Sequence, residues 1–406
     1  MSDCMKKITG LTDLSRAVAV VATACLLAHP VQAAPRLYPL GGGFEGGLEV
    51  EAGGVHVQNF FYESDGGLDV LGYRARPSVV LARGGSDAKL QLGSYIESTH
   101  YDLPSPLDHY LDFGSSARFD WVPLTKHRFD VGAEYVHGHD QSGLVRSQSG
   151  DTDFDRSNEP DEWDNGEFDF GYRYGGPSAL AVSSIQLGYR EREYTNNRSR
   201  TNVLDYATRS IGYELAYTYS PKTSFLFDVG HAATDYDLGN RDGKATTARV
   251  GLRWVATGKT SGDLRVGVRT YSVDSRARPS SQSFTWKLKA DWAPTSLTQF
   301  NLSGGRSVVE TFRTNAFFID TRSVDLNWRQ KWAERFSTRA GLGYVNTNFV
   351  GANRKDDNVS AYVGADLALL PGFALFADYS YRDRSSNEAL RGFEHAEAKF
   401  GLKWNP

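Results

Sequence analysis

The sequence predicts an all-β protein: a transmembrane, antiparallel, up-and-down β-barrel of about 18 strands. The first observation is that apolar and polar residues alternate from Gly46 to the end of the chain. The second is a mean hydropathy of −0.45, with no long apolar run after the N-terminal segment. Only a closed barrel crosses a bilayer without such runs, because all its backbone groups pair within the wall.

The N-terminal residues predict a secretory signal peptide over residues 1–33, followed by the barrel over 34–406. A basic start with Lys6 and Lys7 precedes an apolar run over 17–28 and a small-residue cleavage site ending at Ala33. Cys25 also fits the acylated cysteine of a lipoprotein, which is the competing interpretation. The only other cysteine is Cys4, so the mature chain lacks disulfides and thiolate chemistry.

Export and a barrel together predict the outer membrane of a Gram-negative bacterium, with outer-membrane lipid and lipopolysaccharide as surroundings. The formal net charge of −4 gives no sign of a nucleic-acid partner.

The stretch SFTWKLKADWAP, residues 283–294, shows the strand pattern. Even positions from Phe284 to Trp292 are apolar, and the positions between them include Lys287, Lys289 and Asp291. Aromatic residues bracket many such strands, as in the girdles at membrane interfaces, and the last strand ends on Trp404. A soluble β-sandwich or propeller also alternates, but does not need these girdles or a charged face in nearly every strand.

The lengths of the connections predict which rim of the barrel is periplasmic and which is extracellular. Short segments rich in Gly or Pro follow the even strands, and longer polar segments follow the odd strands. The longest runs from about Ser142 to Asn165. Outer-membrane barrels have short periplasmic turns and longer extracellular loops, and an even strand number returns both termini to one side. The short segments lie at 83–86, 123–126, 175–177, 221–222, 257–259, 294–295 and 371–372.

The charged residues of the strands are predicted to face the lumen, because a charge facing lipid costs about 2–4 kcal/mol at the midplane. Basic residues outnumber acidic ones in this assignment, which predicts a preference for anions. The alternative is that cross-strand ion pairs only fill and stiffen the wall. The predicted lumen-lining basic residues are Arg74, Arg76, Arg118, Arg173, Arg190, Arg192, Arg249, Arg253, Arg265, Arg269, Lys287, Lys289, Arg329, Arg339 and Arg382, with Lys399 and Lys403 beside them.

Three tyrosines on the same face are candidates for stacking on sugar rings, or for simple packing: Tyr95, Tyr271 and Tyr362.

Two constellations have the spacing of metal ligands, and neither is complete. Asp151, Asp153, Asp155 and Glu162 follow an EF-hand loop, but Arg156 stands where glycine is needed, so we expect at most weak Ca²⁺ binding. His137 and His139 lie two residues apart on one strand, which suits either a metal or an ordinary rim. No catalytic set stands out, so we expect neither an enzyme nor a cofactor.

Two phrases, Tyr73-Arg-Ala-Arg-Pro77 and Phe168-Asp-Phe-Gly-Tyr-Arg173, and the overall organisation resemble the β-barrel porin family that includes EpsL-like proteins of exopolysaccharide operons. Asn405 and Pro406 after the terminal aromatic residue depart from the pattern. The resemblance implies polysaccharide export across the outer membrane, together with periplasmic export components. The alternatives are a general or solute-specific uptake porin and, in another class, a barrel enzyme or structural surface protein.

Overall fold

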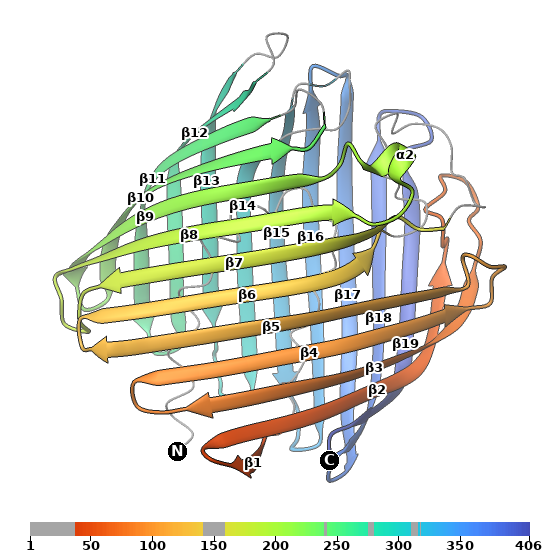
Figure 1. The fold of residues 1–406 in the computed structure, drawn as a ribbon, viewed down its shortest axis with the longest axis horizontal. Coiled ribbons are helices and arrows are strands. Elements are labelled where there is room, and N and C mark those ends of the chain that lie inside the picture. The colour runs from red at the N-terminus through yellow and green to blue at the C-terminus, as the bar shows by residue number, and fades with distance from the viewer. Residues whose placement is uncertain (1–36, 141–158, 239–241, 275–279, 310–315, 317) are drawn as a thin grey trace.

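The computed structural model describes residues 37–140, 159–238, 242–274, 280–309, 316 and 318–406. One continuous antiparallel sheet curls into a barrel (Figure 1). The predicted signal peptide, its cleavage site and residues Asp151, Asp153 and Asp155 lie outside the described residues. The strands are β1 (Tyr38–Gly41), β2 (Phe44–Gln58), β3 (Val70–Gly84), β4 (Ala88–Tyr101), β5 (His109–Leu124), β6 (His127–His139), β7 (Glu162–Tyr174), β8 (Ala181–Tyr194), β9 (Tyr206–Ser220), β10 (Thr223–Tyr236), β11 (Gly243–Thr257), β12 (Thr260–Val273), β13 (Ser281–Trp292), β14 (Thr298–Val309), β15 (Phe318–Lys331), β16 (Phe336–Val350), β17 (Arg354–Leu370), β18 (Phe373–Ser386) and β19 (Phe393–Trp404).

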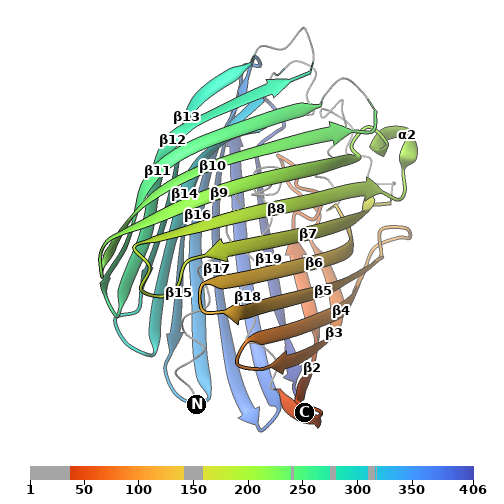
Figure 2. The ribbon, with the colours of Figure 1, turned by 60° about the vertical axis from the view of Figure 1, so that its left-hand side comes forward.

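The barrel closes where β19 pairs with β2, with Trp404 opposite Val50 and Ala396 opposite Gln58. From β2 to β19 each strand is antiparallel to the next one in the chain, which makes a closed 18-stranded barrel. Figure 2 shows the wall continuing around the side that Figure 1 hides. The predicted fold class, up-and-down order and strand number are confirmed.

The alternating sequence produces the two faces of this wall, since successive side chains of a strand point to opposite sides. On β12, Leu264, Val266 and Val268 are 38–47% exposed although they are aliphatic. Their partners on β11 and β13 are also apolar, for example Leu252 and Leu288 opposite Leu264. An apolar belt therefore covers the outside, and the charged positions between its members face the interior.

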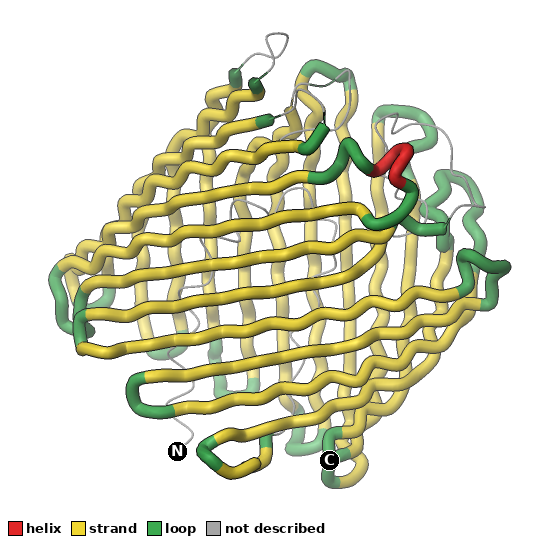
Figure 3. The backbone as a smooth tube through the Cα atoms, viewed as in Figure 1, coloured by secondary structure: helices red, strands yellow, loops and turns green. Residues whose placement is uncertain are grey.

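The two rims differ in the length of their connections (Figure 3). At one rim the turns are short, such as 125–126, 221–222, 258–259 and 371–372. At the other, the connections include 59–69, 195–205 and the long segment before β7. One connection breaks the rule, because only residues 351–353 join β16 to β17 at the long-loop rim. The C-terminus lies at the short-turn rim, where Asn405 N donates to Gly372 O at 2.7 Å.

Two short elements were not expected from the sequence. Strand β1 pairs with the start of β2, with Tyr38 opposite Gly46. Helix α2 (Arg198–Thr201) lies within the connection between β8 and β9. This connection is held by Arg200, whose Nη2 lies 2.5 Å from Asp161 Oδ1 just before β7. Helix α2 thus lies beside a tertiary contact, whereas β1 forms a local hairpin with β2 through the turn at residues 42–43.

Among the residues that the structure describes, no helix is long and apolar enough to cross a membrane.

Candidate functional site: the charged interior wall

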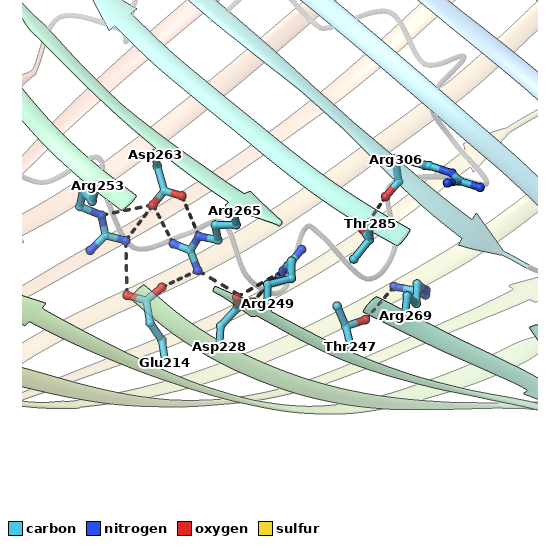
Figure 4. Close-up of polar contacts among 10 residues, drawn as sticks. All are labelled: Glu214, Asp228, Thr247, Arg249, Arg253, Asp263, Arg265, Arg269, Thr285 and Arg306. Carbon is cyan, nitrogen blue, oxygen red and sulfur yellow. Dashed lines mark hydrogen bonds and ion pairs between the residues drawn. The ribbon is translucent and has the colours of Figure 1, made fainter. Parts of the chain in front are cut away.

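Strands β9–β12 carry a network of three arginines and three carboxylates on their inner face (Figure 4). Arg265 lies at its centre, with Nη1 2.7 Å from Glu214 Oε2 and Nε 2.7 Å from Asp263 Oδ1. Arg253 binds the same two carboxylates at 3.3 and 3.1 Å. These charges balance within the network, so it stiffens the wall without adding net charge. We call it the paired cluster, and it consists of Arg249, Arg253, Arg265, Glu214, Asp228 and Asp263.

The shortest ion pair of the paired cluster is the one that Arg249 makes. Arg249 Nη2 lies 2.5 Å from Asp228 Oδ1, and Asp228 is only 2% exposed. The two residues face each other on β10 and β11, so the register of this hairpin creates the pair. A carboxylate buried this deeply requires such a partner, because an isolated buried charge is costly.

A second group of charges crosses the seam where the barrel closes. Arg74 on β3 binds Glu97 at 2.6 Å and Glu51 at 3.3 Å. Lys403 on β19 lies 3.3 Å from Glu51 and 3.0 Å from Asp366. These contacts link residues on β17, β19, β2, β3 and β4, which lie on both sides of the closure. Arg339 extends the group on β16 through its pairs with Asp366 and Asp378.

The acidic side of this interior is larger than the sequence assignment predicted. Glu97 binds Arg74 and lies 3.6 Å from Arg76, while Asp263 binds both Arg253 and Arg265. The alternation rule would have found both residues, since Glu97 is two positions from Tyr95 and Asp263 is two positions from Arg265. The ion pairs thus compensate much of the predicted basic excess. The sequence assignment placed these acidic residues on the lumen face: Asp120, Asp130, Glu134, Asp169, Glu214, Asp228, Asp291, Asp325, Asp366, Asp378 and Glu397. It missed Glu49, Glu51, Glu97, Asp112, Glu167 and Asp263.

The other predicted basic residues differ in the partners of their side chains. Arg190 pairs with Glu167 at 2.6 Å. Arg192 stacks at 4.0 Å over the ring of Trp163. Within the described parts of the chain, Arg118 and Arg173 have no carboxylate at ion-pair distance, and Arg118 is exposed. Further inward-facing positions are those of Lys287, Lys289, Arg329 and Arg382.

Arg269 differs from every arginine of the paired cluster. It lies on β12, four residues beyond Arg265, and only 7% of it is exposed. Within the described residues it makes one hydrogen bond, a long one of 3.5 Å from Nη1 to Thr247 Oγ1. Its Nε is buried and has no hydrogen-bond partner among the residues that the structure describes. Sequence reasoning placed Arg269 on the lumen face but gave no sign that it would lack a carboxylate.

The three tyrosines have different surroundings. Tyr95 lies under the guanidinium of Arg76, 4.2 Å from its ring centroid. Tyr362 donates its hydroxyl to Asn327 Oδ1 at 2.9 Å. Tyr271 is 7% exposed and packs in an apolar cluster with Ala245 and Val308, so little of its ring is open to a solute.

An apolar cluster at the long-loop rim was not expected. Phe60 and Phe61, from the connection after β2, are 6% and 4% exposed and pack on the inner-face residues Val55 and Val57. Leu107, from the connection after β4, joins the same cluster. Two connections therefore fold against the inner wall and cover part of it. The aromatic triplet Phe60-Phe61-Tyr62 in an otherwise polar connection was the available signal.

Of the two candidate metal sites, the structure describes both histidines of one and only Glu162 of the other. His137 Nδ1 lies 2.8 Å from Asp164 Oδ1, while His139 Nδ1 lies 2.8 Å from Asp112 Oδ1. The two imidazoles thus engage separate carboxylates. Glu162 opens β7 opposite His139, so the predicted loop over 142–165 ends before its last four residues, which are in the strand. Over the described part of the chain, no group of three or more His, Cys, Asp or Glu could hold a metal.

Solved barrels share this general architecture at low identity. OccAB4 of Acinetobacter baumannii is 12% identical, covers 89% of this chain and 98% of its own, and has a TM-score of 0.46. OpdK of Pseudomonas aeruginosa is 11% identical with the same coverages and the same TM-score. The FrpB iron transporter of Neisseria meningitidis is 9% identical over 85% of this chain, with a TM-score of 0.48, and this chain spans 63% of its length. No curated protein matches the chain in sequence.

One family covers more than half of the chain. The family described as putative beta-barrel porin 2 matches residues 178–405, from the turn before β8 to the last residue but one. This range contains the whole paired cluster and Arg269. The chain therefore belongs to this family, and the barrel is an outer-membrane porin-like barrel.

Proposed function

We propose that this barrel is a passive outer-membrane pore through which small anionic or neutral solutes enter the cell. The observation that carries the proposal is the interior wall, which is charged but locally neutralised. Barrels of 16–18 strands leave room for an aqueous channel, and charges on the inner face keep such a channel wet.

The pairing of these charges favours small solutes over a long acidic polymer. An acidic polysaccharide would need unpaired cations along its whole path, since its charges must be offset at each repeat. Here the arginines of the paired cluster and of the closure seam are already bound to carboxylates. Arg269, Arg118 and Arg173 leave positive charge at separate points, which suits solutes with one or two charges.

Polysaccharide export is the competing function, because the resemblance to EpsL-like barrels implies it. Export and uptake differ in the size of solute that the pore admits. The apolar cluster of Phe60, Phe61 and Leu107 covers part of the wall at the long-loop rim, which narrows the passage available to a polymer.

Liposome swelling with the purified protein tests the proposal. We expect liposomes that contain the barrel to swell in glucose and in sodium acetate, and to stay unswollen in dextran of polymer size. Swelling in dextran would overturn uptake in favour of export, and exclusion of both small solutes would overturn the proposed pore itself. A deletion strain adds a cellular test: polymer secretion should continue while growth on limiting organic acids slows.

A further inference from the structure

Arg269 is a buried cation that has no counter-charge among the residues that the structure describes. Its guanidinium is 7% exposed, its Nε is without a partner in the described residues, and its one hydrogen bond goes to a neutral hydroxyl. A buried charge without a counter-charge costs several kcal/mol, and arginine does not escape this cost by losing its proton. The cost is removed when an anion occupies the space beside the guanidinium.

Among the residues that the structure describes, no carboxylate pairs with Arg269, and the contact that Figure 4 draws for it goes to Thr247. Arg249 is close enough to repel Arg269, and the nearest acidic partner of Arg249 is Asp228, at 2.5 Å. The hydroxyl of Thr285 donates to the carbonyl oxygen of Arg306 at 2.7 Å. Beyond Arg269 on the same face, Tyr271 belongs to an apolar cluster.

From this geometry we propose that Arg269 is a binding site for the carboxylate group of a small organic anion that passes through the lumen. The inference rests on the proposed pore function and names one contact within it. The buried Nε, which has no partner among the described residues, lies on the side-on edge of the guanidinium, the edge on which a carboxylate accepts two parallel N–H bonds. Thr247 holds the guanidinium from the other end through Nη1. The paired cluster next to it stays neutral, so Arg269 supplies the uncompensated positive charge on this part of the wall.

Planar-bilayer recordings in sodium acetate test the site. The current carried by acetate should saturate with concentration, because a bound carboxylate must leave before the next one enters. Arg269→Gln should raise the half-saturating concentration about tenfold or more, since a charge-assisted hydrogen bond contributes roughly 1.5–3 kcal/mol. Arg118→Gln is the matched control, because it removes an exposed lumen cation that has no carboxylate at ion-pair distance among the described residues.

Arg269→Lys separates the site from a change in net charge. It keeps the positive charge but lacks the planar fork, so it should keep anion selectivity in reversal-potential measurements while saturation weakens. Equal shifts for Arg118→Gln and Arg269→Gln would overturn the proposal, because net lumen charge alone would then explain them. Unchanged saturation in Arg269→Gln would overturn it as well. Failure of the pore function looks different, since the unmodified protein would then conduct no acetate at all.

Discussion

Arg265 and Arg269 lie four residues apart on the inner face of the same strand, yet their surroundings are opposite. Arg265 is within 2.7 Å of two carboxylates and 3.9 Å from a third. Arg269 is as deeply buried and has one long hydrogen bond to a threonine. The difference shows that position on the lumen face does not decide what an arginine does. Its cross-strand partners decide whether it stiffens the wall or remains available to a solute.

The register of the β11–β12 hairpin explains why the two arginines differ. This hairpin pairs Arg253 with Asp263 near the turn and Thr247 with Arg269 farther up. Arg265 also reaches across to Glu214 on β9. Among the residues that the structure describes, Arg269 reaches no such carboxylate. One acidic residue in place of Thr247 would have closed the gap. The threonine therefore keeps Arg269 uncompensated.

The largest effect is expected from Arg265→Met, which removes the central cation of the paired cluster. Glu214 and Asp263 would then keep their charges with fewer partners inside the wall, at a cost of about 4 kcal/mol in the free energy of unfolding. Urea titration of the protein refolded in lipid vesicles measures this change. A loss below about 1 kcal/mol would mean that water in the lumen already screens the network, as it does for surface pairs.

A smaller loss is expected on the other face of the same strand, at Leu264. Its partners on both adjacent strands are leucines, and it is 40% exposed on the apolar belt. Leu264→Arg should destabilise the barrel by about 3 kcal/mol in the same titration, because a charge would face lipid. Leu264→Ile is the control for shape. Equal stability of the arginine variant would place this position away from the hydrocarbon.

The fold was largely predictable because its signal is local. The period-2 alternation fixes which face a residue takes, and connection length separates the two rims. The signal fails where tertiary contacts decide the structure. Helix α2 depends on the Arg200–Asp161 contact, and the segment from Phe60 to Tyr62 reads as an ordinary loop until it packs on Val55.

For the candidate site, the sequence could predict which residues face the lumen but not which of them form ion pairs. Alternation places Arg249, Arg265 and Arg269 inside, and a predicted turn at residues 257–259 would have set Thr247 opposite Arg269. It would not have shown that Arg265 reaches Glu214, because three strand registers intervene. The carboxylates that neutralise one arginine come from several strands, so the absence of one carboxylate can leave the arginine charged and unpaired.

Asp228→Asn would leave Arg249 without its closest counter-charge, as Arg269 is, and should lower the free energy of unfolding moderately. Arg249 would lose its closest counter-charge but keep a hydrogen-bond acceptor, so we expect a loss of about 2 kcal/mol in the free energy of unfolding. The reversal potential in a salt gradient should move toward anion selectivity, because the lumen gains one positive charge. An unmoved reversal potential would mean that the paired cluster lies outside the conducting path.

The smallest change in stability is expected for Arg269→Met, and its sign gives the sharpest test of the comparison. Removing a paired arginine leaves carboxylates uncompensated, whereas removing Arg269 takes away a buried charge that has no counter-charge in the described part of the chain. An apolar side chain of similar length should therefore leave the free energy of unfolding unchanged or raise it by about 1 kcal/mol, since replacing costly buried charges by packed apolar groups is often stabilising. Vesicles prepared with sodium acetate should narrow this gain, because bound carboxylate stabilises only the protein that still carries Arg269. A destabilisation as large as that of Arg265→Met would show that Arg269 holds the wall together, and the distinction between the two arginines would then be lost.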